Sequence, residues 1–187
     1  MVLTQSQRWD AQKDPVEAPS PRVASTAEKA SCSQPKQRQR HKNQGRQKAT
    51  GIFEDADTLS ARLEHRFNTG WSRFRDGDFA AAAKAFEEVI EADIITPLQE
   101  DTAFWNAIAL IRAQNKGAAR RALRRYLSRY PDTRRAPDVI TRLGWLLFEA
   151  GQVNDARTHF QAGSRASDPK VRQRATLGLE AVEAAEP

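Results

Sequence analysis

The chain has 187 residues and a formal net charge of +6; 39% of the residues are hydrophobic and 29% are charged, as is usual for a globular protein. No apolar run approaches the roughly 18 residues that a membrane-spanning helix needs, and the opening sequence MVLTQSQRWDAQKD lacks the apolar core of a secretory signal. These features argue against a membrane-spanning or secreted protein. We therefore expect a cytoplasmic protein, or an envelope-associated one if the native start lies elsewhere.

The excess positive charge lies in the first 50 residues, which hold 10 Lys or Arg and 4 Asp or Glu, whereas residues 51–187 hold 20 of each. The first segment has one aromatic residue, Trp9, so it cannot bury enough apolar surface to offset the entropy of ordering. We expect residues 1–52 to form a disordered basic tail. Its densest basic part contains Lys36, Arg38, Arg40, Lys42, Arg46 and Lys48. Such a tail either binds nucleic acid by counterion release or has no defined partner.

Residues 53–187 show the periodicity of helices. Apolar residues recur at spacings of three and four, and no strand-like alternation is present. One such stripe consists of Phe79, Ala82, Ala83, Phe86, Val89 and Ile90. Helix-breaking stretches such as Asp76-Gly77-Asp78 separate the stripes. The pattern predicts an all-α domain.

A repeated phrase sets the phase of these helices. Residues 70–79 read GWSRFRDGDF and residues 144–153 read GWLLFEAGQV, with Ala107 in AIALIRAQNK halfway between them at a spacing of 37. Twelve residues after each small residue stands an alanine, and four residues later a large apolar residue: Ala82 and Phe86, Ala119 and Leu123, Ala156 and Phe160. Two antiparallel helices need this arrangement, because small residues allow close approach and the large residue fills the adjoining space.

These residues resemble the tetratricopeptide repeat (TPR) family, which has a small residue in its first helix, a tight turn, and an alanine and an aromatic residue in its second helix. The resemblance implies a right-handed helical solenoid of three helix pairs, over about residues 63–96, 100–133 and 137–170. A capping helix would follow over about residues 169–184, begun by Asp168 and Pro169. The period of 37 departs from about 34 in the family. The phrases also resemble those of bacterial TPR proteins of the cell envelope and of regulatory assemblies.

No catalytic, metal-binding or cofactor-binding motif accompanies the repeats. His41, His65 and His159 lie far apart, and the chain has neither a phosphate-binding glycine loop nor a nucleophile elbow. The turn of the repeat explains Asp76-Gly77-Asp78 without a calcium site. We therefore expect no enzyme activity and no cofactor, and we predict a scaffold for protein–protein interaction.

The resemblance implies that the first helices line a concave groove, which holds a peptide or helix of a partner protein. The candidate groove residues are Phe67, Trp71, Arg75, Phe104, Ile108, Arg112, Trp145 and Glu149. We expect Trp71, Ile108 and Trp145 to form an exposed apolar track. Arg75 and Arg112 beside it would favour an acidic and apolar peptide. Phe74, Ile111 and Phe148 are either further groove residues or contacts between neighbouring helices.

Charge is also uneven within the repeats: residues 51–111 hold 5 basic and 12 acidic residues, and residues 112–142 hold 10 and 2. Much of the positive charge forms a basic ridge on one helix: Arg120, Arg121, Arg124, Arg125 and Arg129. Their spacing places the ridge on the outward face. It is either a solvated face or a site for an acidic partner or for self-association. The alternative function is therefore binding of an anionic polymer such as nucleic acid, through the tail and this ridge.

Overall fold

The computed structural model describes residues 56–92 and 98–185, so the predicted tail lies outside the described residues. The described part contains seven helices and no strand, which confirms the all-α prediction. All seven helices belong to one compact unit, Ala49–Pro187. In chain order they are α2 (Ala56–Arg75), α3 (Phe79–Glu91), α4 (Gln99–Arg112), α5 (Lys116–Arg129), α6 (Ala136–Phe148), α7 (Val153–Gly163) and α8 (Pro169–Glu183).

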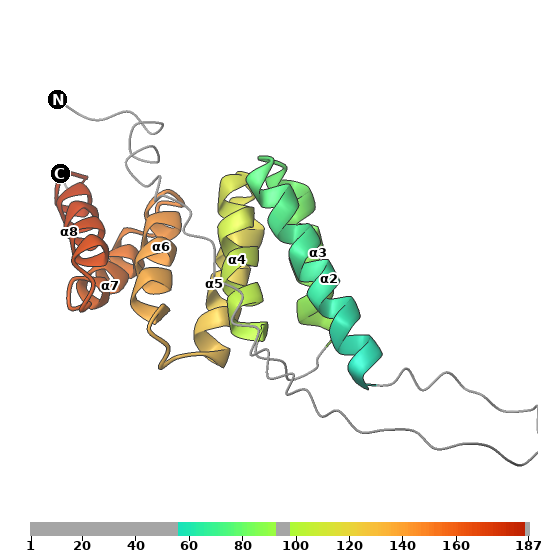
Figure 1. Ribbon diagram of the computed structural model, residues 1–187. Helices are drawn as coiled ribbons and strands as arrows, with labels where there is room; N and C mark the ends of the chain where they lie inside the picture. The colour runs from blue at the N-terminus through green and yellow to red at the C-terminus, as the bar shows by residue number, and fades with distance from the viewer. Residues whose placement is uncertain (1–55, 93–97, 186–187) are drawn as a thin grey trace, which may run out of the picture. The chain divides into compact units, whose positions relative to one another are not determined.

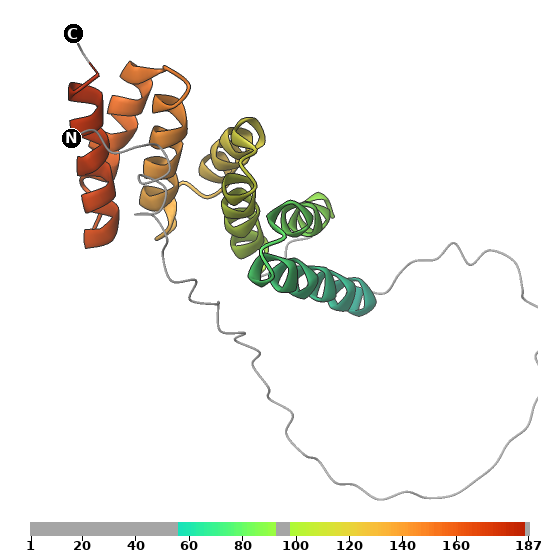
Figure 2. The same cartoon turned by 90° about the horizontal axis from the view of Figure 1, so that it is seen from above.

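The helices pack in chain order. Each contacts the next one along the chain, and α6 also contacts α8. Figures 1 and 2 together show α2, α4, α6 and α8 on one side of the array and α3, α5 and α7 on the other. The arrangement is the predicted one of three helix pairs followed by a last helix. We call α2, α4 and α6 the first helices and α3, α5 and α7 the second helices.

The turns within the three pairs share one backbone conformation. Gly77, Gln114 and Gly151 all have a positive φ, of 82°, 58° and 75°, at the 37-residue spacing of the repeat. Glycine adopts this region without steric cost, whereas Gln114 adopts it against its preference. Immediately afterwards, the side chains of Asp78 and Asn115 accept hydrogen bonds from the backbone N–H of Ala81 and Ala118, at 3.1 and 3.2 Å. These caps begin α3 and α5 where the repeat predicts.

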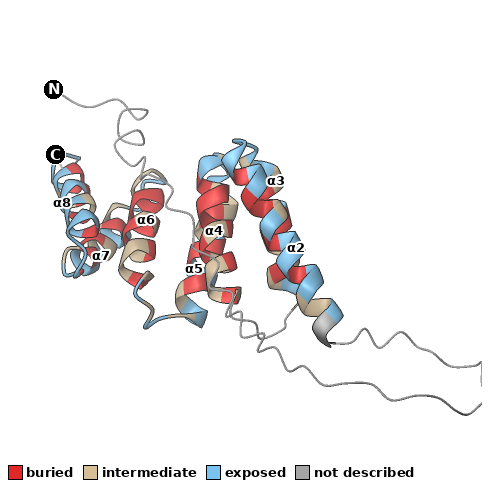
Figure 3. Cartoon of the chain, in the orientation of Figure 1, coloured by how far each residue is buried: buried red, intermediate tan, exposed pale blue. Residues whose placement is uncertain are grey.

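The helix crossings follow the predicted phase. The three alanines and the three large apolar residues of the repeat are completely buried, and they are Ala82, Phe86, Ala119, Leu123, Ala156 and Phe160. Figure 3 shows buried residues on the faces that the helices turn toward one another. A Cβ atom on Gly70 would lie 2.6 Å from the Phe86 ring, and one on Gly178 would lie 2.5 Å from the Phe160 ring. The small residues are therefore needed for the close approach of the helices.

The crossing at Ala119 gives a direct test of the repeat phase. We expect Ala119→Leu to lower the free energy of unfolding by about 1–3 kcal/mol, because the site is fully packed and extra methylene groups force neighbouring side chains to move. The matched control is Ala80→Leu, on an exposed position of α3, which should change stability by less than about 0.5 kcal/mol. Urea unfolding of the two variants measures the difference. Equal stability of the two would contradict the assigned phase.

Candidate partner-binding surface

The predicted groove residues come from three equivalent places on the first helices. Phe67 and Phe104 precede the small residue of their helix by three positions. The apolar row follows the small residue directly and consists of Trp71, Ile108 and Trp145. The charged row follows it by five positions and consists of Arg75, Arg112 and Glu149. Because α2, α4 and α6 share one side of the array (Figure 2), the repeat spacing places equivalent members of each row on neighbouring first helices.

The apolar row is buried, so the expected exposure of these side chains is wrong. Trp71 is 7% exposed, and Ile108 and Trp145 are each 8% exposed. The Trp71 ring lies 4.5 Å from the ring of Trp105 on α4 and 6.4 Å from that of Phe86 on α3. Trp71 and Trp145 therefore fill space between helices, because a large ring gains more from packing than from contact with water.

Neighbouring predicted residues are buried in the same way. Phe67 and Phe104 are 7% and 8% exposed. Phe74 and Ile111 are buried, as expected for contacts between helices, whereas Phe148 is half-buried at the edge of the Trp145 ring. These side chains thus lie mainly beneath the surface of this side of the array and support it by packing between helices.

Trp105 is a central residue of this cluster that sequence reasoning did not assign. Its ring contacts those of Trp71, Phe74 and Phe104, with centroids 4.5, 5.6 and 5.2 Å away. The equivalent positions of the other two pairs are polar, Asn68 and Arg142. The repeat pattern therefore does not predict a role for Trp105, and only its aromatic side chain indicates that it packs between helices.

Three indole N–H groups on this side have no acceptor within the described residues. They are the buried Nε1 atoms of Trp71, Trp105 and Trp145, one on each first helix. A buried tryptophan N–H usually finds a hydrogen-bond partner, and one without a partner costs about 1–3 kcal/mol. These donors therefore have the most to gain if this side rearranges around an acceptor.

The charged row differs along the array. Arg75 is exposed, and Arg112 is exposed with its guanidinium 5.0 Å from the centroid of the Phe79 ring. Glu149 instead forms an ion pair of 3.2 Å with Lys116 at the start of α5, and its side chain is only 10% exposed. Two of the three predicted charges thus reach solvent, and the third is largely neutralised.

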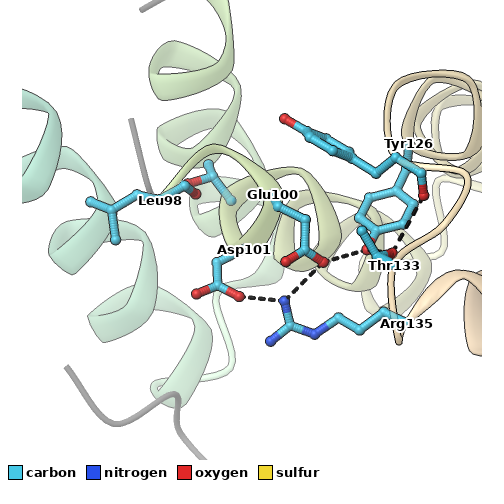
Figure 4. A network of polar contacts seen from close by, with 8 residues as sticks. Leu98, Glu100, Asp101, Tyr126, Thr133 and Arg135 are labelled. Atoms are coloured by element: carbon cyan, nitrogen blue, oxygen red, sulfur yellow. Dashed lines mark hydrogen bonds and ion pairs between the residues drawn. The ribbon is translucent and has the colours of Figure 1, made fainter. Parts of the chain in front are cut away.

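A polar network joins the start of α4 to the segment before α6 (Figure 4). The Arg135 guanidinium pairs with Glu100 at 3.2 Å and with Asp101, and it lies 4.8 Å from the centroid of the Phe104 ring. Burial alone would lower the pKa of Arg135, but the hydrogen bond to Asp101 and the two carboxylates raise it above its ordinary value. Arg135 therefore stays charged and holds the second pair against the third.

Tyr126 extends this network from α5. Its hydroxyl donates a hydrogen bond to Glu100 and lies 2.9 Å from the Thr133 hydroxyl. Burial raises the pKa of Tyr126 well above its ordinary value, and the bond to the Glu100 carboxylate raises it further. The hydroxyl thus stays protonated and remains a donor. This network fixes the position of Phe104, one of the predicted groove residues, relative to α6.

Residues 67–133, which run from within α2 to just beyond α5, match the sequence model of the tetratricopeptide repeat family. This part of the chain therefore consists of tetratricopeptide repeats. A comparison with curated proteins gives no match.

Solved TPR-like structures share the fold. The type III secretion chaperone SycD of Yersinia enterocolitica, in complex with a peptide of the translocator YopD, is 14% identical at a TM-score of 0.56; the match covers 66% of this chain and 94% of that one. PcrH of Pseudomonas aeruginosa is 16% identical at 0.55, covering 66% and 92%. The Sgt2 TPR domain of Aspergillus fumigatus is 16% identical at 0.53, covering 67% and 85%.

The arginines of the basic ridge partly hold helices together. Arg125 pairs with Glu87 of α3 at 2.9 Å, and Arg120 donates to the Gln152 side chain at 3.4 Å. Arg129 lies with its guanidinium 5.8 Å from the centroid of the Tyr130 ring. Arg121 and Arg124 are exposed, and neither has a partner within the described residues. The ridge is therefore a mixed surface, with two arginines directed to solvent and the others engaged within the repeats.

A small pocket lies between α3, α4 and α5, and sequence reasoning did not predict it. Its volume is about 20 Å³, and Gln99, Asn106, Arg125 and Tyr126 are among its lining residues. The Asn106 side chain donates to the Ala83 carbonyl at 2.8 Å and so ties α4 to α3. The space suffices for about one water molecule, which makes it too small for an organic ligand.

No helix in residues 56–92 and 98–185 is long and apolar enough to cross a membrane. No group of three His, Cys, Asp or Glu side chains in these ranges could hold a metal ion.

Proposed function

We propose that this TPR protein is an adaptor, and not an enzyme, that binds a segment of a partner protein on the side formed by α2, α4 and α6. The observation that carries the proposal is the combination, on the first helices, of two exposed arginines and three indole donors that have no acceptor among the described residues. The arginines favour acidic residues in the partner, and the indole groups favour carbonyl or carboxylate oxygens. Among proteins of the same fold, SycD has been solved with a bound peptide.

The burial of the apolar row changes what kind of contact with a partner is expected. Because Trp71 and Trp145 are packed between helices, the partner would contact the edges of the row and the charged row beside it. A segment that has both apolar and acidic residues suits such a surface, since Phe148 and Trp105 are partly exposed and Arg75 and Arg112 lie nearby in the repeat. Binding would then depend on charge as well as on apolar contact.

The proposal is tested with peptides selected on the immobilised full chain from a random library of about 12 residues, long enough to span about 40 Å. The selected peptides should be rich in acidic and apolar residues. We expect Arg112→Glu to weaken peptide binding about tenfold, because it places like charges together. Fluorescence anisotropy measures the affinity, and a thermal melt checks that the fold is kept.

The matched control is Arg124→Glu, the same substitution at an exposed position on the outward face of α5. It should leave peptide affinity nearly unchanged. If Arg124→Glu weakens binding and Arg112→Glu does not, the partner binds the outward face, and the proposed surface is wrong.

Binding of an anionic polymer is the second candidate function, and the exposed Arg121 and Arg124 favour it. Polyanion binding should weaken steeply as salt rises, since bound phosphates or sulfates release counterions. Binding of an apolar and acidic peptide should depend on salt much less. Titration with heparin and with a selected peptide at two salt concentrations separates the two candidates.

Deletion of residues 1–50 tests whether the tail contributes to polyanion binding and to stability. We expect the deletion to weaken heparin binding at low salt, because the tail holds 10 basic residues, and to leave the melting midpoint nearly unchanged. Circular dichroism melts and heparin titrations of both chains measure these effects. Loss of cooperative unfolding would show that the tail is structural, and undiminished heparin binding would assign that role to Arg121 and Arg124.

A further inference from the structure

One edge of the array carries an ordered series of charges. The C-terminal ends of α2, α4, α6 and α8 lie along the upper edge in Figure 1. Five positions after the small residue of each helix stand Arg75, Arg112, Glu149 and Glu183. The charge at this repeated place is therefore positive on the first two helices and negative on the last two.

The charges that reach solvent keep this order. Arg75 and Arg112 are exposed, and neither has a hydrogen bond or an ion pair within the described residues. Glu149 is held by Lys116, so its charge is largely neutralised. Glu183, the last residue of α8, is exposed and has no partner within the described residues. At this repeated place the charge is thus exposed and positive on α2 and α4, paired on α6, and exposed and negative on α8.

Helix stability does not explain this order. The C-terminal end of a helix carries partial negative charge and favours basic residues. That preference explains Arg75 and Arg112, which lie in the last turns of α2 and α4. It does not explain α6 and α8, which have no basic residue in the last turn, nor Glu183, which ends α8 against the preference. The sign change along the edge therefore calls for another reason.

We propose that the charge order fixes the direction in which a partner segment binds, with its acidic end over α2 and α4 and its basic or neutral end toward α8. This inference rests on the proposed binding surface and adds the polarity of the partner. Its occupant is a segment whose acidic residues are concentrated at one end. In the reverse direction, the acidic end would meet Glu183 and lose Arg75 and Arg112. Several exposed charge pairs together make this a difference of about tenfold in affinity.

The direction is measured with a peptide of about 12 residues, extended over about 40 Å, that is selected on the full chain and carries acidic residues in one half only. A nitroxide label is placed on either end, and line broadening is recorded for the indole N–H signals of Trp71, Trp105 and Trp145. We expect a label at the acidic end to broaden Trp71 most, and a label at the other end to broaden Trp145 most. The reverse pattern, or equal broadening from both ends, would overturn the inference.

A charge-reversed chain provides the matched control. The variant with Arg75→Glu, Arg112→Glu and Glu183→Lys should bind the same peptide in the opposite direction, so that the acidic end broadens Trp145 most. An unchanged pattern in a folded variant would also overturn the inference. If the variant fails to fold, the line broadening of the wild-type chain alone decides the direction of binding. A peptide that binds without affecting any of the three indole signals would instead overturn the proposed binding surface.

Discussion

The substitution Phe160→Ala is expected to lower the free energy of unfolding by about 3–5 kcal/mol, the range for removing a fully buried aromatic side chain. Phe160 is completely buried, and its ring lies 5.1 Å from that of Trp145. A Cβ atom on Gly144 or Gly178 would come within 2.8 or 2.5 Å of it, so the ring fills the space between α6 and α8. Alanine would leave a cavity that two rigid helix backbones cannot close. Urea unfolding measures the loss.

The control for this prediction is Leu177→Ala. Leu177 precedes Gly178 on α8 and is 45% exposed, so its truncation removes little packing. We expect a change within about 0.5 kcal/mol. If the two variants unfold at the same urea concentration, the last helix does not pack on Phe160 as described.

Trp71→Ala is expected to cost about 3–5 kcal/mol as well, which is the cost of a core residue and not of an exposed contact. The ring of Trp71 contacts Phe67, Phe74, Phe86 and Trp105, so its loss opens a cavity between the first and second helix pairs.

The variant Trp71→Phe separates the contribution of the ring contacts from that of the indole N–H. Phenylalanine keeps most of the ring contacts and removes the indole N–H, which has no acceptor within the described residues. We expect it to cost clearly less than Trp71→Ala. A melting midpoint of Trp71→Ala equal to that of the wild type would show that Trp71 is exposed after all.

The helix crossings could be predicted from the sequence because they depend on residue size at fixed spacing. Ala82, Ala119 and Ala156 predict where two helices approach closely, and the large residue four positions after each predicts which side chain fills the adjoining space. Both features are local and recur at 37 residues, so the phase of every helix pair follows from them. The start of the last helix at Asp168 was predictable too, and its side chain does cap the Lys170 N–H at 2.8 Å.

The exposure of the candidate surface could not be predicted in the same way. The repeat places Trp71 on a given face of α2, but whether that face is open depends on α4, and there the off-pattern Trp105 covers it. Likewise, the charge of Glu149 appears available in the sequence, yet Lys116 at the start of the preceding second helix neutralises it. Such contacts between neighbouring pairs are not periodic. The residues that would bind a partner remain predictions for this reason.

The most direct test of the binding surface is the ¹H–¹⁵N spectrum of the full chain with and without a selected peptide. The chain has 4 tryptophans, so its indole signals are few and well separated. If the partner binds on the side of the first helices, the indole signals of Trp71, Trp105 and Trp145 should move, and the backbone amides of Arg121 and Arg124 should not. Movement of those two amides with unchanged signals from the three indoles would contradict the account.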